Sequence, residues 1–561
     1  MTDKNEEYLP EDENSLYPNI FMEDGFIWED RGEKKGRFKV GKAIRIIAVH
    51  ENIDTGEISF AVQFEYNGQT KETTLSRAQF QKSQIMDLAK LGADVYEHNA
   101  TQVIKHLLNE EMTAPQEKVH QKLGWDTYSG QLVFKHYKAI GIDSTYIGPL
   151  TIQPKGTYTK WKQIVEQCVL GNCNLELAIL IGLSSALVGF ISSVTKIDSL
   201  IFHIYGLSTQ GKTTATSLAV STFGYPETNQ NGLMQTWMST QNAIIGNLVG
   251  NFGLVFGLDE ISMSDMQDFS TTAYYLAGGK EKGRLDKESR LKESGGWSTT
   301  IVSNGERALT SKANHNIGIA MRILELGNIT WTKNAKSADQ IKHMIQRNYG
   351  HAGPKFATTL LETGTVQVIR KWKEWTQRVM DATPEQDHFS QRIAKKLAIL
   401  MLTGEIAKEA LQLDFDLVGI QQLLIENEKT VQIDRDLGAK ALDYFYEQFT
   451  MNRSNFGELK KTRSKGSHKD EVMLENRKVF GGIYKKSGRM YVYILPSVFH
   501  QWMETGSFDE PKVVLKNWKM KGLLDSEGDR YTRKRKINDE PAMVPVYCIQ
   551  LNSDQADENE A

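Results

Sequence analysis

Apolar and polar positions follow two different periods along this chain, and the change between them predicts how the chain is organised. Between residues 17 and 150, short apolar runs are separated by turn sequences such as Asn67-Gly68, the pattern of β-strands joined by tight turns. From about residue 338 to residue 449, apolar residues recur at i, i+3 and i+4 and predict a series of helices. Strand-like and helical segments alternate between residues 152 and 328, which indicates an α/β core.

A chain of 561 residues is too long for one hydrophobic core and should divide into several domains. We predict an α/β fold in which the core is joined by a helical subdomain, a β-rich N-terminal domain and a small C-terminal domain with the dimensions of a winged helix. The predicted boundaries are an acidic disordered tail at 1–16, the N-terminal domain at 17–150, the α/β core at 151–335, the helical lid subdomain at 336–450, a basic linker at 451–470, the winged-helix-like domain at 471–552 and an acidic tail at 553–561.

Charge is distributed unevenly, although the formal net charge is only −3. Both ends of the chain are acidic: residues 1–15 hold six acids against one lysine, a composition typical of disordered tails. Residues 451–536 hold 20 lysines and arginines against 10 acids. A solvated surface would explain this excess, but so basic a block in a near-neutral protein favours a polyanionic partner.

Three features bear on the compartment. The cysteines Cys168, Cys173 and Cys548 are too few for a four-ligand zinc site and show no paired framework, which predicts a reduced protein. The chain opens without a signal-peptide pattern. Residues 177–194 carry no charge over 18 positions, near the length of a membrane span, but six glycines and serines dilute the run. We therefore predict a cytoplasmic protein outside the membrane, with this run as a helix buried against the core sheet.

Residues 206–213 read Gly-Leu-Ser-Thr-Gln-Gly-Lys-Thr and match the phosphate-binding pattern G-x-x-x-x-G-K-[ST]. An apolar strand-like run precedes them and a helix-like segment follows, so a chance Gly/Lys loop is the weaker interpretation. The glycines let backbone N–H groups turn toward a phosphate, Lys212 would reach the β- and γ-phosphates of ATP, and the Thr213 hydroxyl would bind Mg²⁺. The residues expected at the nucleotide are Gly206, Leu207, Ser208, Thr209, Gln210, Gly211, Lys212, Thr213 and Thr214.

A second motif follows about 45 residues later, where the apolar run 253–258 ends in Asp259 and Glu260. Asp259 at the carboxyl end of a strand would hold Mg²⁺, and Glu260 would polarise the attacking water as general base. Such runs are common by chance, but this spacing from residues 206–213 is typical of a nucleotide hydrolase.

A third strand-like run, 297–303, ends at Asn304. This residue is either a turn former or the sensor-1 side chain that aligns the water against the γ-phosphate.

Between these last two runs, glycines alternate with basic residues at 278–290. A hairpin projecting from the core would place such residues against a nucleic-acid backbone, whereas a solubilising loop is the alternative. The residues expected to contact DNA are Lys280, Lys282, Arg284 and Lys287.

Two arginines and two C-terminal segments complete the candidate set. Arg322 precedes an apolar strand, from which it would reach the γ-phosphate of a neighbouring subunit as a finger, and Arg392 begins a helix where a sensor-2 arginine would contact nucleotide. Either could instead be a structural ion-pair residue.

A basic helix at 511–521 and a basic strand or wing tip at 530–536 suggest DNA contact, with an oligomer-docking module as the alternative. Their expected DNA contacts are Lys516, Lys519, Arg533, Lys534 and Arg535.

The order of these motifs resembles a known family. After residues 206–213 come a Trp237…Thr240…Asn242 segment, Leu-Asp-Glu-Ile at 258–261, Tyr-Tyr-Leu-Ala-Gly-Gly-Lys-Glu-Lys-Gly-Arg-Leu at 274–285, Trp-Ser-Thr-Thr-Ile-Val-Ser-Asn-Gly-Glu at 297–306 and Gly-His-Ala-Gly at 350–353. This string is similar to the helicase-like domain of unknown function in phage and mobile-element replication proteins. It resembles most the Cch-type MCM-like helicases of staphylococcal cassette chromosomes, over about residues 125–410.

The resemblance implies an AAA+ hexamer that unwinds DNA with ATP and Mg²⁺. It also implies a pre-sensor-1 hairpin at 278–290, Arg322 as the finger acting in trans, Arg392 as sensor 2 and a C-terminal winged helix. The expected function is that of a ring-forming replicative helicase of a mobile element. Its expected partners are single-stranded and forked DNA, other copies of the chain and an element-encoded primase, polymerase or single-strand binding protein.

Two other functions remain open from the sequence. An AAA+ initiator or helicase loader would bind origin DNA through the basic C-terminal domain and use ATP as an assembly switch. A protein remodeller is disfavoured, because its pore loops present an aromatic residue among apolar ones, whereas residues 278–290 are rich in Gly, Lys and Arg.

Overall fold

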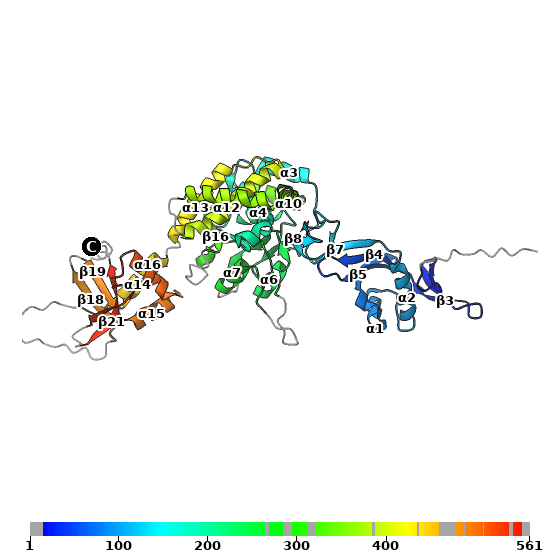
Figure 1. The fold of residues 1–561 in the computed structure, drawn as a ribbon, viewed down its shortest axis with the longest axis horizontal. Helices are drawn as coiled ribbons and strands as arrows, with labels where there is room; N and C mark the ends of the chain where they lie inside the picture. The colour runs from blue at the N-terminus through cyan, green and yellow to red at the C-terminus, as the bar shows by residue number, and fades with distance from the viewer. Residues whose placement is uncertain are drawn as a thin grey trace, which may run out of the picture.

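The computed structural model describes residues 15–263, 269–283, 294–311, 321–383, 388–434, 437–458, 478–486, 489–508, 510–537 and 542–551. Figure 1 shows an N-terminal region, a central body and a C-terminal region that follow one another along the long axis. Almost all of both predicted acidic tails, most of the predicted linker and the predicted DNA contacts Arg284 and Lys287 lie outside the described residues.

The N-terminal region is built mainly of strands, as the alternating pattern predicts. A three-stranded antiparallel sheet, β1-β2-β3, packs beside a five-stranded sheet with the order β10-β7-β4-β5-β6. Helix α2 contributes Ala100, Val103 and Leu107 to the buried cluster that both sheets share. The elements are β1 (Ile20–Glu23), β2 (Phe26–Asp30), β3 (Arg37–Lys42), β4 (Ile44–Asn52), β5 (Ile58–Tyr66), β6 (Gln69–Ser76), α1 (Lys82–Ile85), α2 (Ala100–Glu111), β7 (Gln116–His120) and β10 (Thr145–Tyr146).

The central body is a three-layer α/β arrangement around a parallel sheet with the order β12-β14-β15-β11-β16. Alternate residues of β11 point to opposite faces: Leu200 and Phe202 join the cluster beneath α4 and α5, and Ile201 joins the cluster beneath α6 and α7. The elements are α3 (Tyr158–Cys168), α4 (Cys173–Thr195), β11 (Ser199–Tyr205), α5 (Lys212–Val220), β12 (Met234–Thr236), α6 (Gln241–Leu248), β14 (Phe256–Asp259), α7 (Phe269–Gly278), β15 (Thr299–Gly305) and β16 (Ile323–Gly327).

Helix α4 contains the charge-free run and is buried, as predicted. It is the one helix among the described residues whose length and composition would suffice to cross a membrane, and 78% of its most apolar window is buried inside the protein. A series of helices covers it, including α12 and α10, in the region where the period of 3.6 predicted helices (Figure 1). These helices are α9 (Ala335–Ile345), α10 (Ala352–Thr363), α11 (Thr365–Asp381), α12 (His388–Leu411) and α13 (Leu417–Asp434).

The C-terminal region packs three helices against one face of a five-stranded sheet with the order β17-β18-β19-β21-β20. Aromatic residues form its core, among them Phe445, Trp502 and Trp518. Strand β17 pairs with β18, so residues 456–458 of the segment predicted to be a linker belong to this sheet. The elements are α14 (Leu437–Met451), β17 (Phe456–Glu458), β18 (Gly481–Lys486), β19 (Arg489–Ile494), α15 (Pro496–Thr505), α16 (Pro511–Met520), β20 (Arg533–Lys536) and β21 (Met543–Leu551).

Two groups of residues pack across the predicted boundaries. Strands β8 (Leu123–Tyr128) and β9 (Gln131–Lys135) lie before residue 150, yet Trp125 and Phe134 belong to the central cluster, and β8 pairs with β13 (Asn251–Phe252). Helix α14 begins before the predicted boundary at residue 450, yet its Phe445 belongs to the C-terminal cluster. Apolar periodicity predicts that these elements are buried but not against which cluster they pack.

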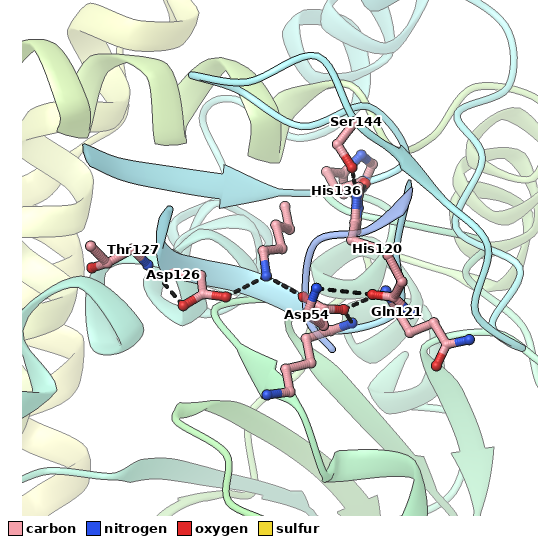
Figure 2. A network of polar contacts seen from close by, with 10 residues as sticks. Asp54, His120, Gln121, Asp126, Thr127, His136 and Ser144 are labelled. Atoms are coloured by element: carbon pink, nitrogen blue, oxygen red, sulfur yellow. Dashed lines mark hydrogen bonds and ion pairs between the residues drawn. The ribbon is translucent and has the colours of Figure 1, made fainter. Parts of the chain in front are cut away.

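A buried lysine joins the N-terminal region to the central body. Lys135 on β9 is 1% exposed, and its Nζ contacts a carboxylate oxygen of Asp54, in the β4–β5 turn, and one of Asp126 on β8. Asp54 also accepts the backbone N–H groups of Gln121 at 2.6 Å and Lys122 at 2.7 Å (Figure 2). Burial acts to raise the pKa of Asp54, but these hydrogen bonds and the Lys135 ammonium outweigh it and lower that pKa.

Two buried histidines extend this network toward the core. His120 bonds to Ser144 Oγ at 2.8 Å (Figure 2) and to the carbonyl oxygen of His136 at 2.7 Å, and His136 Nε2 bonds to the carbonyl oxygen of Phe223 at 2.6 Å. A carbonyl oxygen only accepts, so both Nε2 atoms carry a hydrogen. Burial lowers the pKa of His136 to about 4, and it lowers the pKa of His106 on α2 to about 4 as well.

The lowered pKa values of His136 and His106 should make the stability of the folded protein sensitive to mild acid. The unfolded chain binds a proton at each ring near pH 6.5, whereas the folded chain does so only near pH 4. The stabilisation is therefore complete above pH 6.5 and is lost progressively as pH falls toward 4, by up to about 3 kcal/mol for each ring. Urea unfolding at pH 7, 6 and 5 measures this loss. We expect His136→Gln to lower stability at pH 7 but to flatten its pH dependence; an unchanged slope would contradict the assignment.

Candidate phosphate-binding site

The carboxyl ends of the five parallel strands meet at one edge of the central sheet, and the predicted site residues gather there. Tyr205 of β11 is in register with Gly305 of β15 and with Gly327 of β16, and Asp259 ends β14. The loop of residues 206–211 leaves β11 at this edge and enters α5 at Lys212. In open α/β sheets this edge is where ligands bind.

Backbone conformation explains the two glycines of the loop. Gly206 has φ of 149° and Gly211 has φ of 81°, values that favour glycine. A Cβ on Gly211 would lie 2.4 Å from Oγ1 of Thr332, so this position has no room for a side chain. A distant segment also stabilises the loop, because the backbone N–H of Trp331 donates to the carbonyl oxygen of Gln210 at 2.8 Å.

The loop offers the groups that bind a phosphate. Lys212 is buried, and its Nζ donates to the carbonyl oxygens of Gly206 at 2.9 Å and Leu207 at 2.8 Å. The Lys212 ammonium group therefore lies inside the loop, where its positive charge would stabilise a bound anion. Oε1 of Gln210 is buried without a hydrogen-bond partner among the described residues. A bent backbone, a helix N-terminus and a buried ammonium group fit a nucleotide phosphate.

Asn304 connects the second motif to the phosphate loop. Its Nδ2 donates to Oδ1 of Asp259 at 2.6 Å and to Oγ1 of Thr216 at 3.0 Å, and its Oδ1 accepts the N–H of Glu260 at 3.0 Å. Glu260 has φ of 55°, in the left-handed region, and this bond helps to hold it there. Its carboxylate contacts the Ser262 hydroxyl. The structure thus brings Asp259, Glu260 and Asn304 together beside α5.

Sequence reasoning missed two residues of this edge. Thr216 lies four positions after Lys212, one helical turn on, and that spacing could have identified it. Glu306 accepts a hydrogen bond from Ser208 Oγ at 2.8 Å and so places a carboxylate against the phosphate loop. Nothing in its local sequence distinguishes it from a turn residue after Gly305.

The predicted hairpin has a paired base among the described residues. Lys280 forms an antiparallel bridge with Gly296, and the Glu281 N–H donates to the carbonyl oxygen of Gly295 at 2.9 Å. Lys280 and Lys282 are exposed. Lys280 follows α7 and pairs with a residue just before β15 begins, at the amino end of the sheet, whereas the phosphate loop lies at the carboxyl end.

Arg322 and Arg392 both lie near the start of β16, at the amino end of the sheet, whereas the phosphate loop lies at its carboxyl end. Arg322 directly precedes β16, and the first residue of β16 is level with Ile201 of β11. Ile201 lies four residues before the end of β11, where the phosphate loop begins, which is a distance of about 13 Å along the strand. Its guanidinium lies 4.5 Å from the ring centroid of Tyr274. Arg392 Nη1 lies 3.2 Å from Sδ of Met321. Neither arginine is therefore placed at the phosphate loop of its own chain.

The C-terminal basic residues fall into two sets. Lys516 on α16 and Lys534 on β20 are exposed. Arg533 pairs with Asp525 at 2.8 Å, Arg535 lies 3.6 Å from the same carboxylate, and Lys519 Nζ donates to the carbonyl oxygen of Gly528 at 2.6 Å. Alternation along β20 thus leaves Lys534 exposed to solvent and directs both arginines toward Asp525.

Comparison with known proteins agrees with this architecture. A family model described as a domain of unknown function, DUF927, matches residues 24–295, and one described as the Cch helix-turn-helix domain matches residues 436–554. No curated protein matches the chain. A solved structure described as "SCCmec type IV Cch - active helicase" matches with a TM-score of 0.77 and 22% identity, over 96% of this chain and 98% of that one. The apo A form of the NrS-1 C-terminal region gives a TM-score of 0.25 with 9% identity, over 67% of this chain and 90% of that one.

The chain is a mixed α/β protein with a helical region and a C-terminal helix-turn-helix domain. The resemblance to Cch-type proteins predicted from the sequence is confirmed, because both family models match and the fold is shared over nearly the whole chain. The second family model begins at residue 436, directly before α14, in agreement with the packing of that helix in the C-terminal cluster.

Proposed function

We propose that this protein is an ATP-dependent DNA helicase that works as a ring of identical subunits in the replication of a mobile element. The observation that carries the proposal is the set of contacts that Asn304 makes with Asp259, Glu260 and the phosphate-loop helix. The sheet order β16-β11-β15-β14-β12 supports an AAA+ core, because the loop-bearing strand β11 lies beside the edge strand β16 and the Asn304 strand β15 lies between β11 and the Asp259 strand β14. The matched Cch structure is described as an active helicase, which supports unwinding as the activity.

The residues at the carboxyl edge divide the chemistry among them. ATP supplies the phosphoanhydride bond whose hydrolysis drives movement. The loop backbone and Lys212 would bind its phosphates, while Thr213 and Asp259 would hold Mg²⁺. Glu260 would take the proton of the attacking water, and Asn304 would orient that water. The Asn304 amide also fixes the Asp259 carboxylate, so one side chain sets the positions of both acids.

The positions of Arg322 and Arg392 support a ring. Both lie near the start of β16, at the amino end of the sheet, whereas their own phosphate loop lies at its carboxyl end. Arginines there would complete the site of a neighbouring subunit, where they would stabilise the charge of the transition state. The exposed Lys280 and Lys282 would contact one DNA strand, and the helix-turn-helix domain, with Lys516 and Lys534, would bind duplex DNA.

Unwinding of a labelled forked DNA tests the proposal. We expect the wild type to separate the strands with ATP, Lys212→Ala to lose both hydrolysis and unwinding, and Lys282→Ala to lose unwinding but keep hydrolysis. Lys373→Ala, which removes an exposed lysine on α11, is the matched control and should unwind normally. Loss of unwinding in this control as well would contradict the role of the hairpin.

One alternative has an observation in its favour. The helix-turn-helix match supports an initiator or helicase loader, which would bind origin duplex and use ATP as an assembly switch. DNA-stimulated hydrolysis with no unwinding on forks of either polarity would favour this alternative over the helicase.

A further inference from the structure

A chain of buried hydrogen bonds crosses the central sheet on its α6 and α7 face. Trp237 Nε1 donates to Oγ of Ser303 at 2.9 Å, and Ser303 Oγ lies 3.0 Å from Nδ1 of His203. His203 Nε2 lies 2.8 Å from the carbonyl oxygen of Arg307. The three side chains are at most 1% exposed, so water does not satisfy them. Buried polar groups of this kind are costly unless each has its partner.

Donor and acceptor chemistry fixes the direction of the two outer bonds of this chain. An indole N–H only donates and a carbonyl oxygen only accepts, so His203 carries its hydrogen on Nε2. We assign a neutral ring to His203, in which Nδ1 is an acceptor, so the Ser303 hydroxyl accepts from Trp237 and donates to Nδ1 of His203. Loss of the Trp237 donor would leave the Ser303 oxygen one bond short and free the hydroxyl to rotate.

One end of the chain is attached to the strands that carry the catalytic candidates. The backbone N–H of Trp237 donates to the carbonyl oxygen of Asp259 at 3.1 Å, which fixes the end of β14. Ser303 directly precedes Asn304 on β15, and successive side chains of a strand point to opposite faces. Ser303 is therefore held on one face of the sheet while Asn304 bridges Asp259 and α5 on the other.

The other end is attached to the loop that follows β15. Arg307, whose carbonyl oxygen receives the His203 hydrogen, is adjacent to Glu306, the residue that contacts the phosphate loop. The same loop is held a second time, because the N–H of Thr310 donates at 3.0 Å, and its hydroxyl at 2.8 Å, to the buried carboxylate of Glu325. Glu325 is the registered neighbour of His203 on β16.

We propose that Trp237, Ser303 and His203 form a positioning relay that sets the Asn304 amide and the Glu306 loop for hydrolysis. The side-chain bonds of the three described above run to one another and to the Arg307 carbonyl oxygen, so these side chains act through Asn304, Asp259 and Glu306. The relay gives a role to the Trp237 segment, to which the sequence motifs assign none. This proposal rests on ATP hydrolysis by the protein, as proposed above.

Trp237→Phe tests the relay, because it keeps an aromatic ring and removes only the donor and part of the ring volume. We expect kcat for ATP hydrolysis to fall about tenfold or more, with KM for ATP changed less than about twofold. Trp161→Phe is the matched control: Trp161 is equally buried and donates Nε1 to Ser221 Oγ at 3.2 Å, in the other core cluster. It should lose similar stability and keep its kcat. Equal kcat values for the two variants would overturn the proposal.

A second pair of variants covers the case in which Trp237→Phe does not fold. Gln at position 203 can accept from Ser303 and donate to Arg307, whereas Leu can do neither. We expect His203→Gln to retain several-fold more kcat than His203→Leu at equal nucleotide affinity, and equal kcat values would overturn the relay. A wild-type protein that hydrolyses no ATP would instead overturn the proposed function, a result that is recognised before any variant is made.

Discussion

Glu260→Gln should bind ATP with nearly wild-type affinity and hydrolyse it at least about 100-fold more slowly. Glutamine keeps the shape of the side chain and its contact with Ser262, and the bond from the residue's N–H to Asn304 is a backbone contact that the substitution leaves alone. What disappears is the carboxylate that takes the proton of water, and a general base contributes about 10²–10⁴-fold. Phosphate release under steady state and equilibrium binding of a fluorescent ATP analogue measure the two quantities separately.

The matched control is Glu306→Gln, which changes the other carboxylate of this edge. Its amide oxygen can still accept from the Ser208 hydroxyl, so the loop should keep its position. We expect its hydrolysis to fall less than tenfold. The opposite result, a large loss in Glu306→Gln and a small one in Glu260→Gln, would move the base to Glu306.

The sequence predicted the parts of the site that depend on local residue types. The glycines and Lys212 are recognisable because a phosphate loop needs their conformations and charge at fixed spacing, and β14 and β15 are recognisable as apolar runs. The meeting of Asp259, Glu260 and Asn304 also follows from sequence, since parallel strands end at one edge. Whether the phosphate-loop residues bind ATP and Mg²⁺ stays a prediction.

Contacts between distant segments could not be predicted. Glu306 and Ser208 are 98 residues apart, and Trp237 and Ser303 are 66 residues apart. The residues around Trp237 would have the same local pattern if its side chain only filled the core, so they do not predict its hydrogen bond to Ser303. The position of Arg392 beside Met321 likewise depends on how α12 packs against the sheet, which apolar periodicity does not specify.

The junction between the N-terminal region and the central body also depends on contacts between distant residues, here the charged side chains of Asp54, Asp126 and Lys135. Asp54 lies in the turn Asp-Thr-Gly, which by sequence predicts only a hairpin, and Lys135 ends an apolar strand where an exposed lysine would be expected. Their side chains are instead 2% and 1% exposed. A buried ion pair is costly to break from one side, because the remaining charge has no compensation.

Lys135→Met should therefore destabilise the protein by about 3 kcal/mol. Methionine fills a similar volume but leaves the Asp54 carboxylate with only the N–H groups of Gln121 and Lys122 as hydrogen-bond donors among the contacts described above. Hydrogen exchange of residues 116–128 measures the effect locally, and urea unfolding measures it globally. Exchange of these two amides should accelerate by about 100-fold if the junction opens as a unit.

Two further variants separate charge from packing at this junction. Asp126→Asn removes the partner that is 44% exposed and should cost at most about 1 kcal/mol, because water already screens that pair. Asp54→Asn combined with Lys135→Met removes both buried charges and should recover part of the stability that Lys135→Met loses. If the double variant is less stable than Lys135→Met alone, the junction is held by the shape of the Asp54 turn and its backbone hydrogen bonds, and the ion pair contributes little.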